Sequence, residues 1–170
     1  LKLPVNIIAV MPLAENMPDG AGARVGDVIA SRSGQTVEIT NTDAEGRLIL
    51  AEALTLAGEM KPAAVIDVAT LTGACAVALG DNCAGLLSND AGSCHRLLRT
   101  SHARGAPLCP PPFLEDTSME GLKSPLADVG NVGPKGGGSI HHGMVHHTLG
   151  HEDGPLPLEQ TAAAPTTEGT

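Results

Sequence analysis

Residues 36–69 read TVEITNTDAEGRLILAEALTLAGEMKPAAVIDVA, and this stretch decides the fold. The β-formers of Thr36–Ile39 come first and indicate a strand. From Arg47 onward, leucines and alanines recur at the spacing of one helix face until Lys61-Pro62 ends the pattern. Ala63–Ala69 is then an almost continuous apolar run, which is typical of a parallel strand covered on both faces. A strand, a helix and a strand in this order predict a βαβ unit and an α/β protein.

Other elements extend this unit toward both ends of the chain. The apolar run Val5–Met11 predicts a buried strand that leaves the sheet into a long surface loop. Val28–Ser31 and Thr36–Ile39 flank Ser33-Gly34, and a turn dipeptide between β-formers predicts a hairpin or a bent pair of strands. Cys94–Ala103 predicts a short helix before a proline-rich break. We therefore expect an α/β fold, with part of a mixed, largely parallel sheet flanked by helices.

Composition narrows the classes of function. The chain has 170 residues, which suits one domain or a piece of a larger one. Its 19 acidic and 10 basic residues give a net charge of −9, which argues against nucleic acid because phosphate binding needs clustered Lys and Arg. No apolar stretch reaches the ~18 residues of a membrane span and no secretory signal is evident, so we expect a cytoplasmic protein without a membrane partner. The 4 cysteines include no CxxC pair, which predicts reduced thiols.

Charged residues gather at the corner between the predicted strand Thr36–Ile39 and the helix that starts near Arg47. The corner, Asn41–Leu48, reads NTDAEGRL. Ligands of open α/β sheets bind at the carboxyl ends of strands, and the loop Thr70–Gly73 follows the next strand in the same sense, so the two loops are expected to be neighbours. In extended backbone Asp43 and Glu45 would project to the same side. Their carboxylates could then hold one or two divalent cations, which activate water for hydrolysis.

Arg47 strengthens this hypothesis. A cation in the first turn of a helix opposes the helix macrodipole, so its placement there indicates an anion or a developing oxyanion nearby. Two structural interpretations are alternatives to a metal site. Thr42 and Glu45 also satisfy the S/T-x-x-E capping box, and Asp67 inside its apolar strand is more typical of a hydrogen-bonded structural acid than of a ligand. The residues alone leave these alternatives open.

The octapeptide NTDAEGRL, together with VIDVATLTG downstream, resembles the signature of the leucyl aminopeptidase family, which are cytosolic dinuclear metallopeptidases. The resemblance begins at LKLPVNIIAV and continues through ENMPDG, GDVI and SGQTVE to ALGDNCAGLL. It returns, more loosely, in ADVGNVGPKGGG. In total it covers Leu1–Gly138.

The resemblance implies an enzyme that releases N-terminal amino acids, often leucine, from peptides with the help of two divalent ions, manganese or zinc. It matches Asp43 and Glu45 to metal ligands. It matches Arg47 to the catalytic arginine, which holds a bicarbonate-like anion or assists the transition state. The loop that lines the substrate pocket is matched by Thr70, Leu71 and Gly73. A cytoplasmic homo-hexamer acting on peptides is the assembly that the family implies.

The chain departs from the family pattern at both ends. Family members carry a preceding segment with a metal-binding lysine, further aspartate ligands and a second catalytic lysine. Leu1 then corresponds to a point inside the catalytic domain, so we expect the sheet to be incomplete at its N-terminal side. We divide the chain into residues 1–138, part of a metallo-aminopeptidase catalytic domain, and residues 139–170, a divergent His-rich tail. The composition of the tail from Gly154 onward predicts disorder.

Two rival functions follow from these departures. The chain could be a truncated, catalytically inactive fragment or a non-catalytic partner subunit. It could also be a His-rich metal-sequestering protein, since the i,i+4 spacing of some tail histidines permits chelation on a helix. The favoured interpretation of the histidines is a solvated tail without a role. The residues concerned are His141, His142, His146, His147 and His151.

Overall fold

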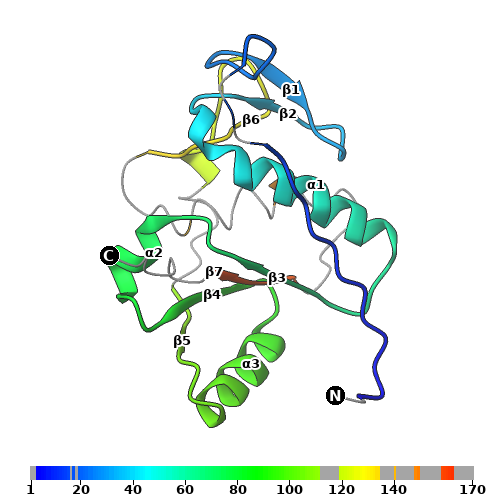
Figure 1. Cartoon of the computed structure of the whole chain (residues 1–170), viewed down its shortest axis with the longest axis vertical. Coiled ribbons are helices and arrows are strands. Elements are labelled where there is room, and N and C mark those ends of the chain that lie inside the picture. Colours follow the sequence, from blue (N-terminus) through cyan, green and yellow to red (C-terminus); the bar gives the residue numbers. More distant parts are fainter. Residues whose placement is uncertain are drawn as a thin grey trace.

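The computed structural model describes residues 3–15, 17, 19–111, 119–134, 140, 148–149 and 158–162. Its elements form layers: a small sheet, helix α1, a larger sheet and helix α3 follow one another down the long axis of the molecule (Figure 1). Mixed parallel and antiparallel sheets combine with helices, so the α/β class predicted from the sequence is confirmed.

The small sheet has the order β1-β2-β6. Strands β1 (Val28–Ala30) and β2 (Thr36–Glu38) are antiparallel, as the predicted hairpin requires, and Gly34 adopts a φ of 91° in the turn between them. Strand β6 (Val129–Gly130) pairs parallel to β2. The sheet therefore joins two segments about 90 residues apart in the sequence, with Val37 facing Val129 in the register.

Helix α1 (Glu45–Glu59) follows a 3-10 turn, η1 (Thr42–Ala44), and begins two residues before Arg47, the start suggested by the sequence. It ends before Lys61, whose φ of 51° turns the chain toward Pro62. The apolar face of α1 packs under the small sheet, as its spacing predicts. The core cluster there consists of Val37, Ala51, Leu122, Val129 and Leu149.

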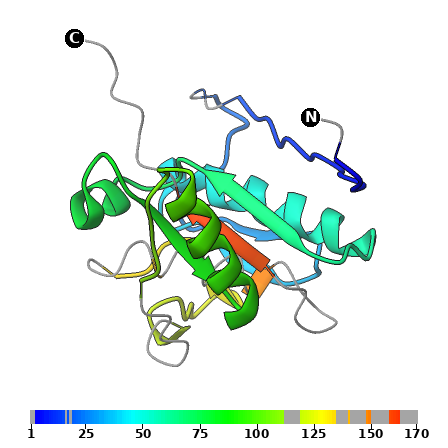
Figure 2. The ribbon, with the colours of Figure 1, turned by 90° about the horizontal axis from the view of Figure 1, so that it is seen from below.

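The larger sheet has the order β3-β7-β4-β5. Helix α3 packs against β4 and β5, which Figure 2 shows from below, and it agrees with the helix predicted over Cys94–Ala103. Strand β4 is buried at its centre, where Leu86 is only 1% exposed. The bounds are β3 Val65–Ala69, α2 Gly73–Leu79, β4 Ala84–Ser88, α3 Ala91–Ala103, β5 Leu108–Cys109 and β7 Leu158–Ala162.

The predicted βαβ unit is wrong, although its three elements exist. Strand β2 pairs with β1 and β6, whereas β3 pairs with β7, so the two strands belong to different sheets. Besides its hairpin partner β1, strand β2 pairs with the remote β6, and β3 pairs with the remote β7. Helix α1 passes from one sheet to the other instead of crossing over a single sheet (Figure 1).

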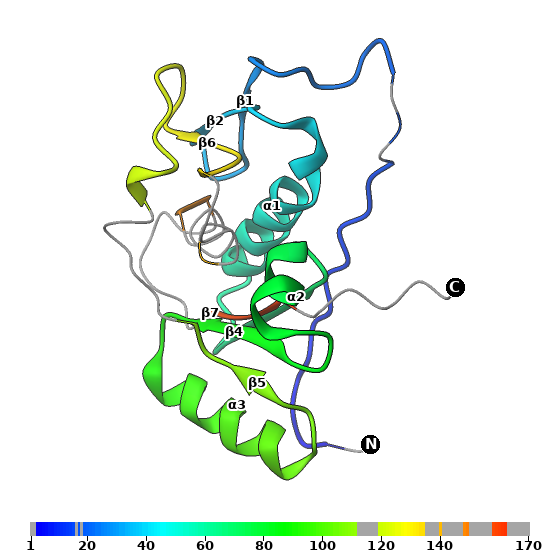
Figure 3. The ribbon, with the colours of Figure 1, turned by 90° about the vertical axis from the view of Figure 1, so that its left-hand side faces the viewer.

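The predicted strand Val5–Met11 is also wrong. The described residues there form no strand, and their apolar side chains are exposed, for example Ile7 at 76% and Ile8 at 69%. Figure 3 shows this segment running apart from the rest of the molecule. An apolar run becomes a strand only where a neighbour accepts its backbone hydrogen bonds, and no strand within the described ranges pairs with it.

One part of the tail differs from the disorder that its composition predicts. Leu158–Ala162 form β7, which lies between β3 and β4 and pairs with both. The division of the chain into residues 1–138 and 139–170 stays a prediction. All four cysteines are free, and Cys75 is buried, in agreement with reduced thiols. Over the residues that the structure describes, no helix is both long and apolar enough to cross a membrane.

Candidate functional site

The corner that carries the NTDAEGRL signature is helical. The side chain of Asn41 accepts a hydrogen bond from the backbone N–H of Asp43 at 3.0 Å, and this bond caps η1. Asp43 is exposed on η1, Glu45 is half-buried at the first position of α1, and Arg47 is buried one half-turn further on. The three side chains thus pass from solvent into the interior within five residues.

This geometry corrects the extended backbone assumed for Asp43 and Glu45. Residues two apart in a 3-10 turn point about a third of a turn away from each other, so alternation along a strand is not what relates these two carboxylates. Asp43 and Glu45 were selected from the sequence, but they do not project to the same side through an extended backbone, because the backbone here is helical. Their role as metal ligands stays a prediction.

The alternative capping box is not formed. Within the described corner, Asn41 caps η1, and the N-cap position of α1, Ala44, has no side-chain hydrogen bond. Glu45 instead leaves its Oε2 atom buried without a hydrogen-bond partner. A buried carboxylate oxygen without a partner is costly in a folded protein, and it is the kind of atom that coordinates a divalent cation.

The residues present fit part of a metal site. Glu45 supplies a buried oxygen and Asp43 supplies an exposed one at the same corner. Among the described residues, however, no group of three or more His, Cys, Asp and Glu side chains could hold an ion. The five tail histidines, His141, His142, His146, His147 and His151, lie outside the described residues. Two carboxylates are therefore the part of a metal shell that the described corner offers.

Arg47 is buried, and its guanidinium points toward Asn131, the residue that follows β6. Its Nη1 donates a hydrogen bond to the backbone carbonyl of Asn131 at 2.7 Å. Burial lowers the pKa of Arg47 to about 10, so the side chain still carries its positive charge at neutral pH. A fixed cation thus lies on the first turn of α1, where the sequence predicted a need for an anion.

The loop predicted to line a substrate pocket lies beside this corner. A Cβ atom added at Gly46 would come within 3.0 Å of Cδ1 of Leu71, so the loop after β3 packs directly on the first turn of α1. The expected proximity of the two loops is confirmed by this contact. Thr70 is exposed, and Gly73 is exposed at the start of α2, which Thr72 caps through a hydrogen bond from the N–H of Ala74.

Asp67 and Asn131 are two further polar residues that are buried. Asp67 is 7% exposed on β3, and its role as a structural acid stays a prediction. Asn131 is fully buried, and it hydrogen-bonds to Thr40 and Asn41 at the start of the corner. No pattern in the sequence predicts a role for Asn131, although it lies within the stretch ADVGNVGPKGGG, which resembles the family more loosely. A lone asparagine in a glycine-rich loop reads as a turn residue, which hides such a contact.

Comparison with known proteins now gives the context of this corner. The model of the cytosol aminopeptidase family, catalytic domain, matches residues 1–150 and so extends beyond Gly138. A protein of a Geobacter species named "Probable cytosol aminopeptidase" is 53% identical over 140 residues, which are 82% of this chain and 28% of that protein. The chain therefore spans little more than a quarter of the curated relatives that it matches.

Solved structures give the same result. A leucyl aminopeptidase from Leishmania major, in complex with actinonin, superposes with a TM-score of 0.86 and 34% identity over 93% of this chain and 30% of that one. A tomato leucine aminopeptidase variant has a TM-score of 0.82 and 36% identity over 87% of this chain and 29% of that one. At these identities the likeness extends to the sequence as well as the fold.

Proposed function

The chain belongs to the cytosol aminopeptidase family, and we propose that it forms part of a metal-dependent aminopeptidase that releases N-terminal residues, leucine among them, from peptides. The family match over residues 1–150 supports the peptidase class. The observation that carries metal dependence is the buried Oε2 of Glu45, which has no hydrogen-bond partner. Because the chain covers 28% of its relatives, the activity is proposed for a whole protein of the family type.

In this proposal Asp43 and Glu45 are metal ligands. The complete site holds two divalent ions, manganese or zinc, with further ligands supplied outside the described corner. A bound divalent ion supplies Lewis acidity, which polarises a carbonyl group and lowers the pKa of water. Glu45 suits this role because its oxygen is already desolvated, so coordination replaces no existing hydrogen bond of that atom.

Arg47 is proposed as the catalytic residue that holds a bicarbonate-like anion or stabilises developing negative charge. Its burial strengthens any interaction with an anion, since charges interact more strongly where water is excluded. Its hydrogen bond to the carbonyl of Asn131 fixes the direction of the guanidinium. The substrate loop is proposed to consist of Thr70, Leu71 and Gly73, with Leu71 held against the first turn of α1.

The remaining properties follow from the family. Peptides are the proposed substrates, and a homo-hexamer in the cytoplasm is the proposed assembly and location. We propose no nucleic-acid partner, in keeping with the net charge of −9.

A second candidate is a catalytically inactive fragment or partner subunit. The observation in its favour is that the described residues contain no group of three or more potential metal ligands. Two carboxylates alone bind an ion weakly. This candidate predicts that the corner cannot support turnover even when the other parts of a family enzyme are supplied.

A chimera separates the two candidates. The 140 residues that align with the Geobacter relative replace the corresponding part of that protein, and hydrolysis of leucine-p-nitroanilide is measured with added Mn²⁺ or Zn²⁺. The unmodified relative is the positive control. We expect metal-dependent turnover that Asp43→Ala abolishes. Asp81→Ala, which changes an exposed aspartate in another loop, should leave turnover unchanged.

A chimera that folds, binds the metal and shows no turnover would support the inactive candidate. Turnover that survives Asp43→Ala at saturating metal would instead show that Asp43 is not a ligand. The two results are distinct because the first concerns the whole segment and the second concerns one side chain.

A further inference from the structure

Asn131 occupies the centre of a hydrogen-bond network at the signature corner. Its side chain is completely buried. Its Oδ1 accepts from the N–H of Thr40 at 2.8 Å, the hydroxyl of Thr40 at 2.9 Å and the N–H of Asn41 at 3.2 Å. Its Nδ2 donates to the carbonyl of Asn41 at 2.7 Å. The primary amide of asparagine supplies both the acceptor and the donor of this network.

The backbone of the same residue holds two more parts of the corner. Its N–H donates to the carbonyl of Glu38 at 3.0 Å, at the end of β2. Its carbonyl accepts from Nη1 of Arg47 at 2.7 Å. Asn131 thus links Glu38, at the end of β2, to Thr40 and Asn41. It also binds the buried guanidinium of Arg47 on α1.

The network reaches the proposed metal ligands through Asn41. Asn131 fixes the backbone of Asn41 from both sides, because it accepts from its N–H and donates to its carbonyl. The side chain of Asn41 in turn accepts from the N–H of Asp43 at 3.0 Å. The position of Asp43 therefore depends on Asn131 through a single intervening residue.

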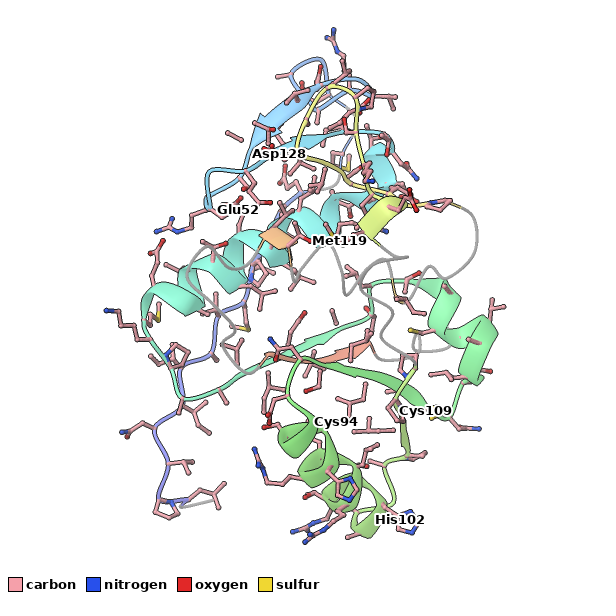
Figure 4. All side chains as sticks on the ribbon, turned by 180° about the vertical axis from the view of Figure 1, so that it is seen from behind. Glu52, Cys94, His102, Cys109, Met119 and Asp128 are labelled. Atoms are coloured by element: carbon pink, nitrogen blue, oxygen red, sulfur yellow. The ribbon has the colours of Figure 1, made fainter. Side chains whose placement is uncertain are left out.

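These bonds are not needed to join β2 to β6. That pairing is already made by Val37 with Val129 and by Glu38 with Gly130. At the other end of β2, Asp128, labelled in Figure 4, accepts from the N–H and the hydroxyl of Thr36 at 2.8 and 2.7 Å. All four side-chain bonds of Asn131 lie beyond the last paired residue, where the corner begins.

We propose that Asn131 is a positioning residue of the site. It sets the Thr40–Asn41 corner that carries Asp43 and, through its carbonyl, the direction of Arg47. The inference rests on the proposed function for its catalytic meaning, whereas the network itself is independent of turnover. Partners of this kind, one step removed from metal ligands, typically change metal affinity by about 10–100-fold when they are altered.

The test compares three variants of the full 170-residue chain. Asn131→Ala removes the whole side-chain network, and Asn131→Asp keeps the acceptor but loses the donor to Asn41. Asp128→Ala is the matched control, because it removes two bonds to β2 at the opposite end of the same strand. Backbone hydrogen exchange by mass spectrometry on the peptide that covers residues 39–47 reports the corner. Relaxation of water protons during a Mn²⁺ titration reports metal affinity.

We expect Asn131→Ala to speed exchange in this peptide by about tenfold or more and to weaken Mn²⁺ binding by about 10–100-fold. Asn131→Asp places a buried carboxylate oxygen against the carbonyl of Asn41, so it should change both at least as much, and Asp128→Ala should change neither. Unchanged exchange in Asn131→Ala, or an equal rise in Asp128→Ala, would overturn the inference. If the unsubstituted chain binds no Mn²⁺, Asp43 and Glu45 need the further ligands proposed for the whole protein, and the exchange result alone decides the role of Asn131.

Discussion

Substitution of Glu45 by glutamine tests whether this residue stabilises the fold or is held ready for a ligand. Its Oε2 is buried without a hydrogen-bond partner, which costs about 1–3 kcal/mol in a folded protein. Glutamine keeps the shape and removes the charge. Loss of a negative charge from the first turn of α1 costs about 0.3–1 kcal/mol through the helix macrodipole. The larger effect is relief of the buried charge, so metal-free Glu45→Gln should range from neutral to about 2 kcal/mol more stable.

The matched control is Glu52→Gln on the same helix. Oε1 of Glu52 accepts a hydrogen bond from the N–H of Arg32 at 2.8 Å, and neutralising this acceptor should destabilise the chain by up to about 1 kcal/mol. The two substitutions are chemically identical, yet only Glu52→Gln should destabilise the chain. Chemical denaturation followed by circular dichroism measures both changes in the absence of metal.

Added Mn²⁺ should reverse the order of stability between the unsubstituted chain and Glu45→Gln. An ion that binds only the folded state at 100 times its Kd stabilises that state by about 2.7 kcal/mol. Mn²⁺ should therefore stabilise the unsubstituted chain and Glu52→Gln to the same extent and should stabilise Glu45→Gln much less. A metal-free loss of more than about 1 kcal/mol in Glu45→Gln would refute the reasoning, because it would mean that Glu45 makes stabilising contacts of its own. Equal stabilisation of both variants by Mn²⁺ would refute the ligand assignment.

Three further predictions follow from individual contacts. Gly46→Ala gains about 1 kcal/mol of helix propensity but brings a Cβ to 3.0 Å from Cδ1 of Leu71, so a double-mutant cycle should find Gly46→Ala more favourable beside Leu71→Ala than beside Leu71. Threonine at both Ile66 and Val68, which are 59% and 70% exposed on β3, should reduce concentration-dependent self-association in sedimentation velocity, and unchanged sedimentation would contradict this. Hydrogen bonds from the backbone and the side chain of Thr36 hold the pKa of Asp128 below its usual range. The contribution of Asp128 to stability is therefore present above the unfolded-state pKa and disappears as pH falls through the folded-state pKa. Asp128→Asn should flatten acid unfolding in that window, and an unaltered acid transition would disprove this prediction.

Local patterns predicted the elements well because their causes are local. The spacing of α1, the apolar run of β3 and the turn at Gly34 each depend on neighbours within a few residues. Pairing could not be predicted in the same way. Strand β3 has β7 as its hydrogen-bonded neighbour, and β7 comes from a segment whose composition predicts disorder. The run Val5–Met11 has the composition of a strand and lacks a partner among the described strands.

The candidate site shows the same division between local and remote causes. The sequence selected Asp43, Glu45 and Arg47, but an extended backbone does not relate them, since they follow one another on η1 and α1. Their arrangement is fixed by Asn131, which is 84 residues from Arg47 and 90 from Asn41 in the chain. No spacing rule reaches across such a separation. A helical corner can present a buried carboxylate and a buried cation only where a remote segment satisfies the backbone groups that the corner leaves open, and Asn131 does so with both its amide and its carbonyl.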